Sequence, residues 1–150
     1  MADPTTTAQG VFDIAMALID EVNETSGATD TADTREYKVR TLLILNALRG
    51  ELYPYSDTFP TPTDGKRPIV AVIQSFEDVI GMDDYICQSV MPYGLAAQLL
   101  ADENPTLAGF LQQRYEELRN NLSKGLPQSE GAIEDVYGIL YHPYNHFSRW

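Results

Sequence analysis

The sequence predicts an all-α protein, a small bundle of about four to five helices with a long proline-rich loop and an extended aromatic C-terminal tail. Apolar residues recur at the 3.6-residue helical period in several stretches, and helix-capping residues, glycines and prolines separate these stretches. The length of 150 residues and the 43% hydrophobic content fit one globular domain that buries a core without cross-links. We expect this helical domain to span residues 1–125 and the tail to span residues 126–150.

The first helix is predicted over about Ala8–Glu24. Its apolar stripe consists of Val11, Ile14, Ala15, Leu18 and Val22. A polar stretch, residues 25–33, interrupts the pattern before the second helix. Asp33 is the expected N-cap of that helix because Glu36 follows three residues later, as in a capping box.

The second helix is predicted to run to about Tyr53, and apolar residues occupy most of its circumference. Such a helix is expected either at the centre of the fold or shared with a neighbouring subunit. Arg49 and Glu51 are expected to keep its end in solvent.

Residues 54–68 contain four prolines and predict a loop that is long for a connection between helices. Residues 69–73, Ile-Val-Ala-Val-Ile, fit either a short strand or a buried helical turn. The next helix is expected to begin with Asp83 or Asp84 as its cap.

The segment Pro92-Tyr93-Gly94 lies within this third helical stretch and predicts a kink or two short helices. Pro92 lies too deep to be a first-turn proline of a helix that starts near Asp84, so it would remove a backbone hydrogen bond. Gly94 carries no side chain, so another helix is expected to approach closely there.

The last helix is predicted from Pro105, with Asn104 as its cap, to a stop at Gly125. Its apolar stripe is Leu107, Leu111, Tyr115, Leu118 and Leu122. In the tail that follows, five of the last 14 residues are aromatic, and these form the expected subunit interface: Tyr137, Tyr141, Tyr144, Phe147 and Trp150. Two alternatives remain open, because the tail can fold back on its own domain or dock on another copy.

The net charge of −12 argues against a general grip on nucleic-acid phosphates. No Lys or Arg precedes Arg35, and none lies between Arg67 and Arg114. These acidic stretches fit solvated faces, or else a surface that repels phosphate or meets a basic partner.

The sequence predicts no catalytic, cofactor-binding or metal-binding residues. His142 and His146 have metal-ligand spacing, but Pro143 breaks the helix that this spacing needs. Cys87, the single cysteine, permits no internal disulfide and is expected to be a small buried residue. Glu21 and Glu24 form a Glu-x-x-Glu pair, a pattern with which some all-α nucleoside triphosphate pyrophosphohydrolases bind a metal ion. Such a metal-dependent enzyme is the alternative function. The second helix lacks the matching acidic pair that these enzymes use. We see no signal peptide and no apolar run long enough to cross a membrane.

The segment MPYGLAAQLLADENPTLAGFLQQRYEELRNNL resembles the C-terminal helical pair of phage head–tail connector proteins, the small adaptors below the portal. The earlier segments VFDIAMALIDEVNE and REYKVRTLLILNAL, followed by ELYP, are similar to prophage-encoded members of that family. The resemblance covers roughly residues 10–124.

This resemblance implies a non-enzymatic virion structural protein that forms a homo-oligomeric ring. The ring would join the portal protein to tail or stopper proteins and let DNA pass without specific binding. It also implies a location in the virion, and in the host bacterial cytoplasm during assembly.

Overall fold

The computed structural model describes residues 3–19, 27–29, 31–57, 65–66 and 70–124, and within them the predicted all-α fold is confirmed. The helices are α1 (Ala8–Leu18), α2 (Arg35–Leu52), the 3-10 helix η1 (Tyr53–Tyr55), α3 (Asp84–Ser89), α4 (Met91–Leu100) and α5 (Pro105–Lys124). The β-pairing in this part of the chain is a single isolated bridge between Thr7 and Val79. The five aromatic tail residues and the proposed tail, 126–150, lie outside the described ranges.

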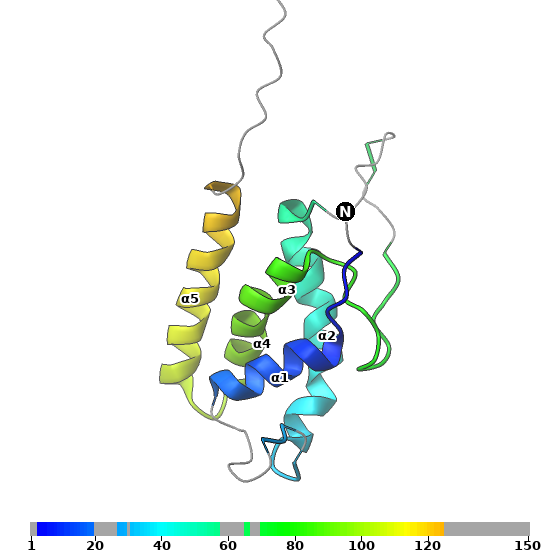
Figure 1. Cartoon of the computed structure of the whole chain (residues 1–150). Helices are drawn as coiled ribbons and strands as arrows, with labels where there is room; N and C mark the ends of the chain where they lie inside the picture. The colour runs from blue at the N-terminus through cyan, green and yellow to red at the C-terminus, as the bar shows by residue number, and fades with distance from the viewer. Residues whose placement is uncertain (1–2, 20–26, 30, 58–64, 67–69, 125–150) are drawn as a thin grey trace, which may run out of the picture.

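Helix α4 is the centre of the bundle (Figure 1). It packs against α1, α2, α3 and α5, and its ten residues include no charged side chain. All of them except Tyr93 and Gln98 are buried. Of the two alternatives for the second helix, a place at the centre is therefore wrong, because Val39 and Leu43 of α2 are apolar yet exposed. The other alternative, an apolar face shared with a neighbouring subunit, stays a prediction.

The third helical stretch is divided into two short helices, as expected. The break lies at Val90, between α3 and α4, where φ is −111° and ψ is −52°. Because α4 begins at Met91, Pro92 falls in its first turn, where a missing backbone N–H costs no intrahelical hydrogen bond. The expectation that Pro92 lies too deep for a first turn is thus wrong.

Helix α5 begins where the sequence places it. The amide of Leu107 donates to the Asn104 side-chain oxygen at 3.1 Å, which makes Asn104 a true cap. The short turn at residues 101–104 lets α5 run back along α4, and this helix pair forms the most extensive packing in the fold (Figure 1).

Two boundaries differ from the predictions, the end of α1 and the start of α2. Helix α1 ends at Leu18 with Ile19 as its C-cap, well before Glu24, and residues 20–26 lie outside the described part. Asp33 is exposed and does not cap α2. The cap position belongs to the buried Thr34, whose hydroxyl donates to the Thr29 carbonyl at 2.7 Å and closes the preceding turn.

Of the proline-rich loop, residues 58–64, 67 and 68 lie outside the described part, as does Ile69 of the next segment. Residues 70–73 are neither strand nor helical turn but irregular chain that lies along α2. The hydrogen bonds that hold this segment come from side chains of α2. The apolar sequence of residues 69–73 gives no sign of these partners.

Candidate interaction surface

Gly94 is the point where three helices meet. A Cβ atom built on Gly94 would lie 3.0 Å from Leu48 Cδ2 of α2 and 3.0 Å from Tyr115 Cδ2 and Cε2 of α5. A contact of 3.0 Å is tighter than nearly all that a real Cβ makes, so any side chain at position 94 would force Leu48 or Tyr115 to shift. The half-buried Tyr93 beside it packs against the core.

Tyr115 connects the close contact at Gly94 with a charged pair on the surface, Arg119 and Glu51. Its ring is buried, and the Arg119 guanidinium carbon lies 5.5 Å from the ring centroid. Arg119 in turn forms an ion pair with Glu51 at the end of α2. Burial, together with the nearby Glu51 charge, raises the pKa of the Tyr115 hydroxyl, so the phenol stays neutral.

Arg49 is buried, which corrects the expectation that it keeps the end of α2 in solvent. It donates to the Ile80 carbonyl at 3.2 Å and also to the Ala71 carbonyl. Asn46, one turn earlier, accepts from the Ile73 amide at 2.9 Å and donates to the Ile73 carbonyl at 3.1 Å. Burial lowers the pKa of Arg49. Together, Asn46 and Arg49 anchor the segment 71–80 to α2.

The anchored segment also caps α1. The amides of Ala8 and Gln9, which have no partner within the helix, donate to the carbonyls of Asp78 and Phe76 at 3.0 and 2.9 Å. Phe76 meets Phe12 edge to face at a centroid distance of 5.8 Å, and the Lys38 ammonium lies 4.6 Å from the Phe76 ring centroid.

Many acidic side chains accept hydrogen bonds from neighbouring segments. Asp84 accepts from the amides of Thr5 and Thr6, both at 2.9 Å, and from both hydroxyls. The Thr6 hydroxyl and amide, with those of Thr5, hold the pKa of Asp84 at about 2. Asp78 accepts from the amides of Gln74 and Ser75, which lower its pKa. The sequence suggests that such acids are simply solvated. Asp78 and Asp84 instead also hold neighbouring loop residues by hydrogen bonds, and both remain negatively charged.

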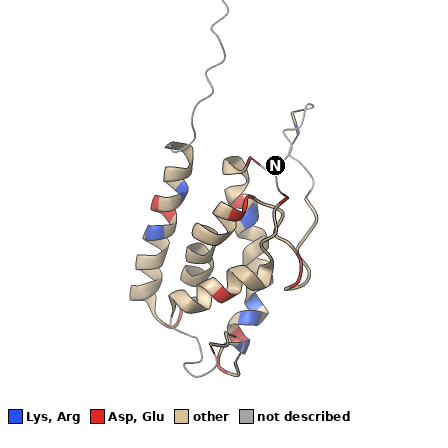
Figure 2. Ribbon diagram, in the orientation of Figure 1, with Lys and Arg blue, Asp and Glu red and all other residues tan. Residues whose placement is uncertain are grey.

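Helices α2 and α5 carry both acids and bases, α1 and α3 carry one acid each, and the central α4 carries no charged side chain (Figure 2). Within the described ranges, no three His, Cys, Asp or Glu side chains come together as a metal site requires. Glu21, Glu24, His142 and His146 lie outside these ranges.

Cys87 is fully buried, and its thiol donates to the Met82 carbonyl at 3.6 Å. Burial, followed by the charges of Asp84 and Asp83, raises its pKa to about 12. The thiol is therefore protonated at neutral pH and contributes packing rather than a nucleophile.

Large apolar side chains are exposed on α2. Val39 and Leu43 are 76% and 77% exposed, and their spacing of four residues places them on one helix face. Ala47, four residues further, is also exposed. We call Val39, Leu43 and Ala47 the α2 stripe.

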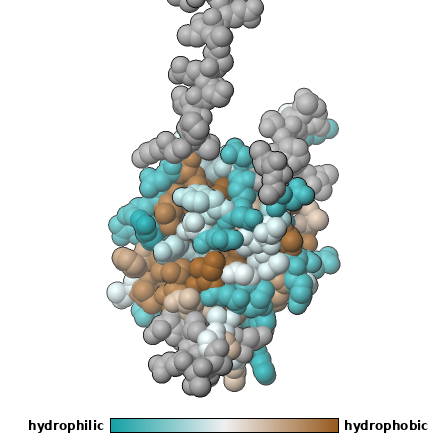
Figure 3. All heavy atoms as spheres, in the orientation of Figure 1, coloured by the Kyte–Doolittle hydropathy of each residue, from teal (hydrophilic) through white to brown (hydrophobic). Residues whose placement is uncertain are grey.

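Apolar surface also gathers around the first turns of α5 and the adjacent end of α1 (Figure 3). On α5, Phe110 is 64% exposed. Isolated exposed apolar residues are common on monomers, whereas aligned ones mark a surface that another chain can cover.

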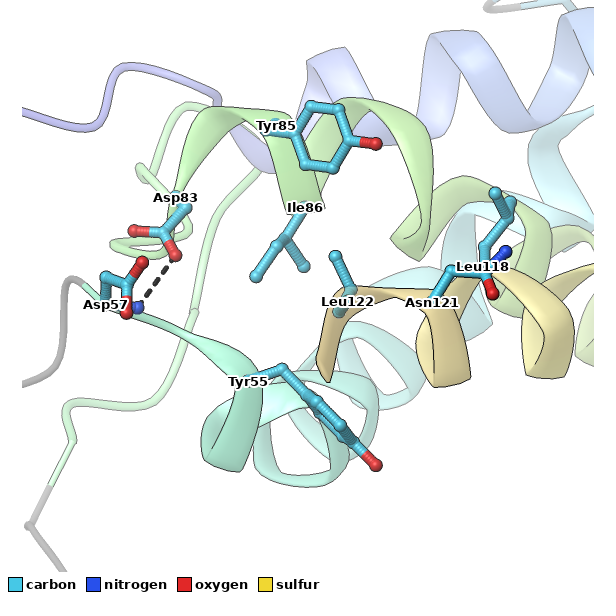
Figure 4. A pocket seen from close by; sticks show the side chains of 8 residues that line it. All are labelled: Tyr55, Asp57, Asp83, Tyr85, Ile86, Leu118, Asn121 and Leu122. Atoms are coloured by element: carbon cyan, nitrogen blue, oxygen red, sulfur yellow. Dashed lines mark hydrogen bonds between the residues drawn. The ribbon is translucent and has the colours of Figure 1, made fainter. Parts of the chain in front are cut away.

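A groove of about 380 Å³ opens between η1, α3 and the end of α5. Its lining residues are Tyr55, Asp57, Asp83, Tyr85, Ile86, Leu118, Asn121 and Leu122. Ile86 and Leu122 point toward each other across it, while Asp83 accepts from the Asp57 amide at 2.9 Å at one side (Figure 4). Tyr85, 68% exposed, stands at the rim.

The sequence did not reveal this groove, because its walls come from three segments far apart in the chain. One available signal was Tyr85, an aromatic residue two positions after the helix cap, where the first turn faces solvent. Leu118 and Leu122 were predicted as core positions, and they do pack against the core while leaving one side open.

None of the helices in the described part of the chain combines the length and apolar character needed to cross a lipid bilayer. Comparison of the chain with known protein families, curated proteins and solved structures found no match.

Proposed function

We propose that this protein is the subunit of a head–tail connector ring, a non-enzymatic virion component that joins a portal protein to tail or stopper proteins. The observation that carries the proposal is the meeting of the two most distinctive parts of the resembling segment. The Pro-Tyr-Gly-Leu-Ala-Ala sequence supplies Gly94, the Arg-Tyr-Glu-Glu sequence supplies Tyr115, and these two residues are in close contact.

This contact supports the proposal because it gives the shared pattern a physical reason. Gly94 must be small for Tyr115 to pack on α4, and Arg119, one turn beyond Tyr115, links the same helix to Glu51 of α2. The two sequence stretches are thus parts of one packing unit.

The α2 stripe supports an oligomeric role. Val39 and Leu43 are exposed on a helix that also sends Leu45, Leu48 and Leu52 into the core. Burying two large aliphatic side chains contributes roughly 1.5–3 kcal/mol each where they become fully covered. In a ring, a neighbouring subunit would cover them.

The acidic character fits a channel for DNA. The carboxylates of Asp78 and Asp84 have lowered pKa values, so they stay ionised at neutral pH. In the proposed ring, such charges would repel phosphates and let DNA slide past rather than bind.

Electron microscopy of the purified full chain, alone and mixed with its portal protein, tests the proposal. The expected result is a closed ring with a central channel in the mixture, bound at one end of the portal. Failure of the two proteins to associate, or magnesium-dependent turnover of nucleoside triphosphates by the chain, would overturn it.

A further inference from the structure

We propose that the groove between η1, α3 and α5 receives the aromatic arm, residues 137–150, of an adjacent copy of this chain. This inference rests on the proposed function and deepens it by naming a joint between neighbouring subunits. The groove and the arm are different surfaces, so the contact is head-to-tail, and its repetition builds a closed ring when the rotation between copies completes a full turn.

The chemistry of the groove suits an aromatic occupant. Ile86, Leu118 and Leu122 supply an apolar wall, and Tyr55 and Tyr85 supply rings on opposite sides (Figure 4). Its volume of about 380 Å³ falls within the range of pockets that hold small organic molecules. Aromatic side chains of the arm therefore fit both its size and its polarity.

The charges are complementary. The groove carries Asp57 and Asp83 at its edge, and no Lys or Arg is among its lining residues. Arg149 is the one fully charged side chain of the arm, which also contains His142 and His146 and no Asp or Glu. Opposite charges at the rim of an aromatic contact favour one register of docking and speed association.

The length of the chain beyond α5 allows the arm to reach a neighbouring copy, and the proposed ring is the reason to choose that copy as the partner. Leu118, Asn121 and Leu122 belong to the last turns of α5, so the chain leaves α5 beside its own groove. Residues 125–136 then precede the arm, and they span about 40 Å when extended. A compact domain of this size has a radius of gyration of about 14 Å, so this spacer is long enough to reach the groove of an adjacent copy.

Disulfide trapping between two full-length variants tests the joint. Cys87 is the only cysteine, so Cys87→Ser removes the native thiol in both variants. One variant then carries Asn121→Cys in the groove wall, and the other carries Tyr144→Cys in the arm. On mild oxidation of the mixture, we expect a disulfide between the two different chains, identified by mass spectrometry.

The matched control replaces Asn121→Cys by Gln113→Cys, which introduces an exposed thiol on α5 away from the groove. We expect at least several-fold less cross-linking there. Equal cross-linking at both positions would overturn the groove as the docking site. A disulfide that forms only within one chain, in a variant carrying Asn121→Cys and Tyr144→Cys together, would show that the arm closes on its own groove and would also overturn the proposal.

Fluorescence gives a second measurement without any cysteine change. Trp150 is the only tryptophan, so quenching of its emission by acrylamide reports whether the arm is covered. We expect Tyr85→Glu, at the groove rim, to increase quenching, and Phe110→Glu, similarly exposed on α5, to leave it unchanged. Equal quenching in the wild type and in Tyr85→Glu would contradict the proposal.

These outcomes separate the joint from the function. A ring on the portal without groove-specific cross-links refutes the joint and leaves the connector proposal standing. Groove-specific cross-links between chains that never bind the portal refute the connector proposal instead.

Discussion

At the scale of single residues, small and polar side chains decide how the helices meet. Gly94 lets Tyr115 and Leu48 pack closely on α4. Arg49 and Asn46 of α2 hold the irregular segment 71–80 by hydrogen bonds. Asp84 joins the N-terminal residues Thr5 and Thr6 to α3. Each of these residues acts through a few short contacts, so each can be tested by one substitution.

Replacing Gly94 by Ala should destabilise the protein by about 1–3 kcal/mol, because the added methyl group meets Leu48 and Tyr115 at 3.0 Å. The control is Gly109→Ala on α5, where nothing lies within 4 Å of the new Cβ. That substitution should stabilise the helix by up to about 1 kcal/mol. Urea denaturation measures both, and a Gly94→Ala protein stabilised as much as the Gly109→Ala protein would contradict the close approach.

Asp84 should make stability depend on pH at the acidic end. Its pKa in the folded protein is about 2, below its ordinary value of 3.8. Its contribution is therefore present above about pH 4 and is lost as the pH falls toward 2. Asp84→Asn should lower Tm at neutral pH, and the difference in Tm from the wild type should shrink between about pH 4 and 2.

Thermal melts of both proteins across this pH range provide the measurement, with Asp33→Asn, an exposed carboxylate, as the control. A Tm difference for Asp84→Asn that is the same at low and neutral pH would count against the role assigned to this carboxylate.

At the scale of elements, the segment 71–80 connects helices that are distant in sequence. α2 anchors it through Asn46 and Arg49, while its carbonyls at Phe76 and Asp78 receive the first amides of α1. Its order therefore depends on side chains of another element and not on its own β-branched sequence.

Arg49→Met should remove these charged hydrogen bonds while keeping most of the side-chain volume. We expect a loss of about 1.5–3 kcal/mol in the free energy of unfolding, together with faster amide exchange in residues 71–80. Arg114→Met, which breaks only an exposed pair with Glu117, should cost less than about 0.5 kcal/mol. Unchanged exchange in 71–80 would mean that Arg49 does not anchor this segment.

At the scale of the whole molecule, apolar residues fall into two groups, those that form the core of the monomer and those that lie exposed on its surface. The core is complete around α4, yet the α2 stripe lies outside it. Residues that are apolar without supporting the monomer are the ones expected to matter when copies associate.

Leu43→Glu should leave monomer stability within about 0.5 kcal/mol of the wild type and reduce self-association, whether alone or on the portal. Light scattering at several concentrations measures the mass of the assemblies, and chemical denaturation measures the fold. Gln113→Glu adds the same charge elsewhere on the exposed surface and should leave the mass unchanged. Equal effects of the two changes would indicate general charge repulsion instead of a specific interface.

The sequence by itself determined the all-α class, the break near Pro92, and the Asn104 cap and apolar stripe of α5. These features depend on local periodicity, on a missing amide and on a side chain that bonds to its own next turn, all of which are written in neighbouring residues. Tertiary structure alone decided that α4 is central, that Arg49 is buried, that Thr34 occupies the cap position, and that three separate segments form the groove. Except for the Thr34 cap, which depends on hydrogen bonds to Thr29 and Thr31 in the preceding turn, these features depend on contacts between residues far apart in the chain, where an apolar or charged residue gives no sign of its partner.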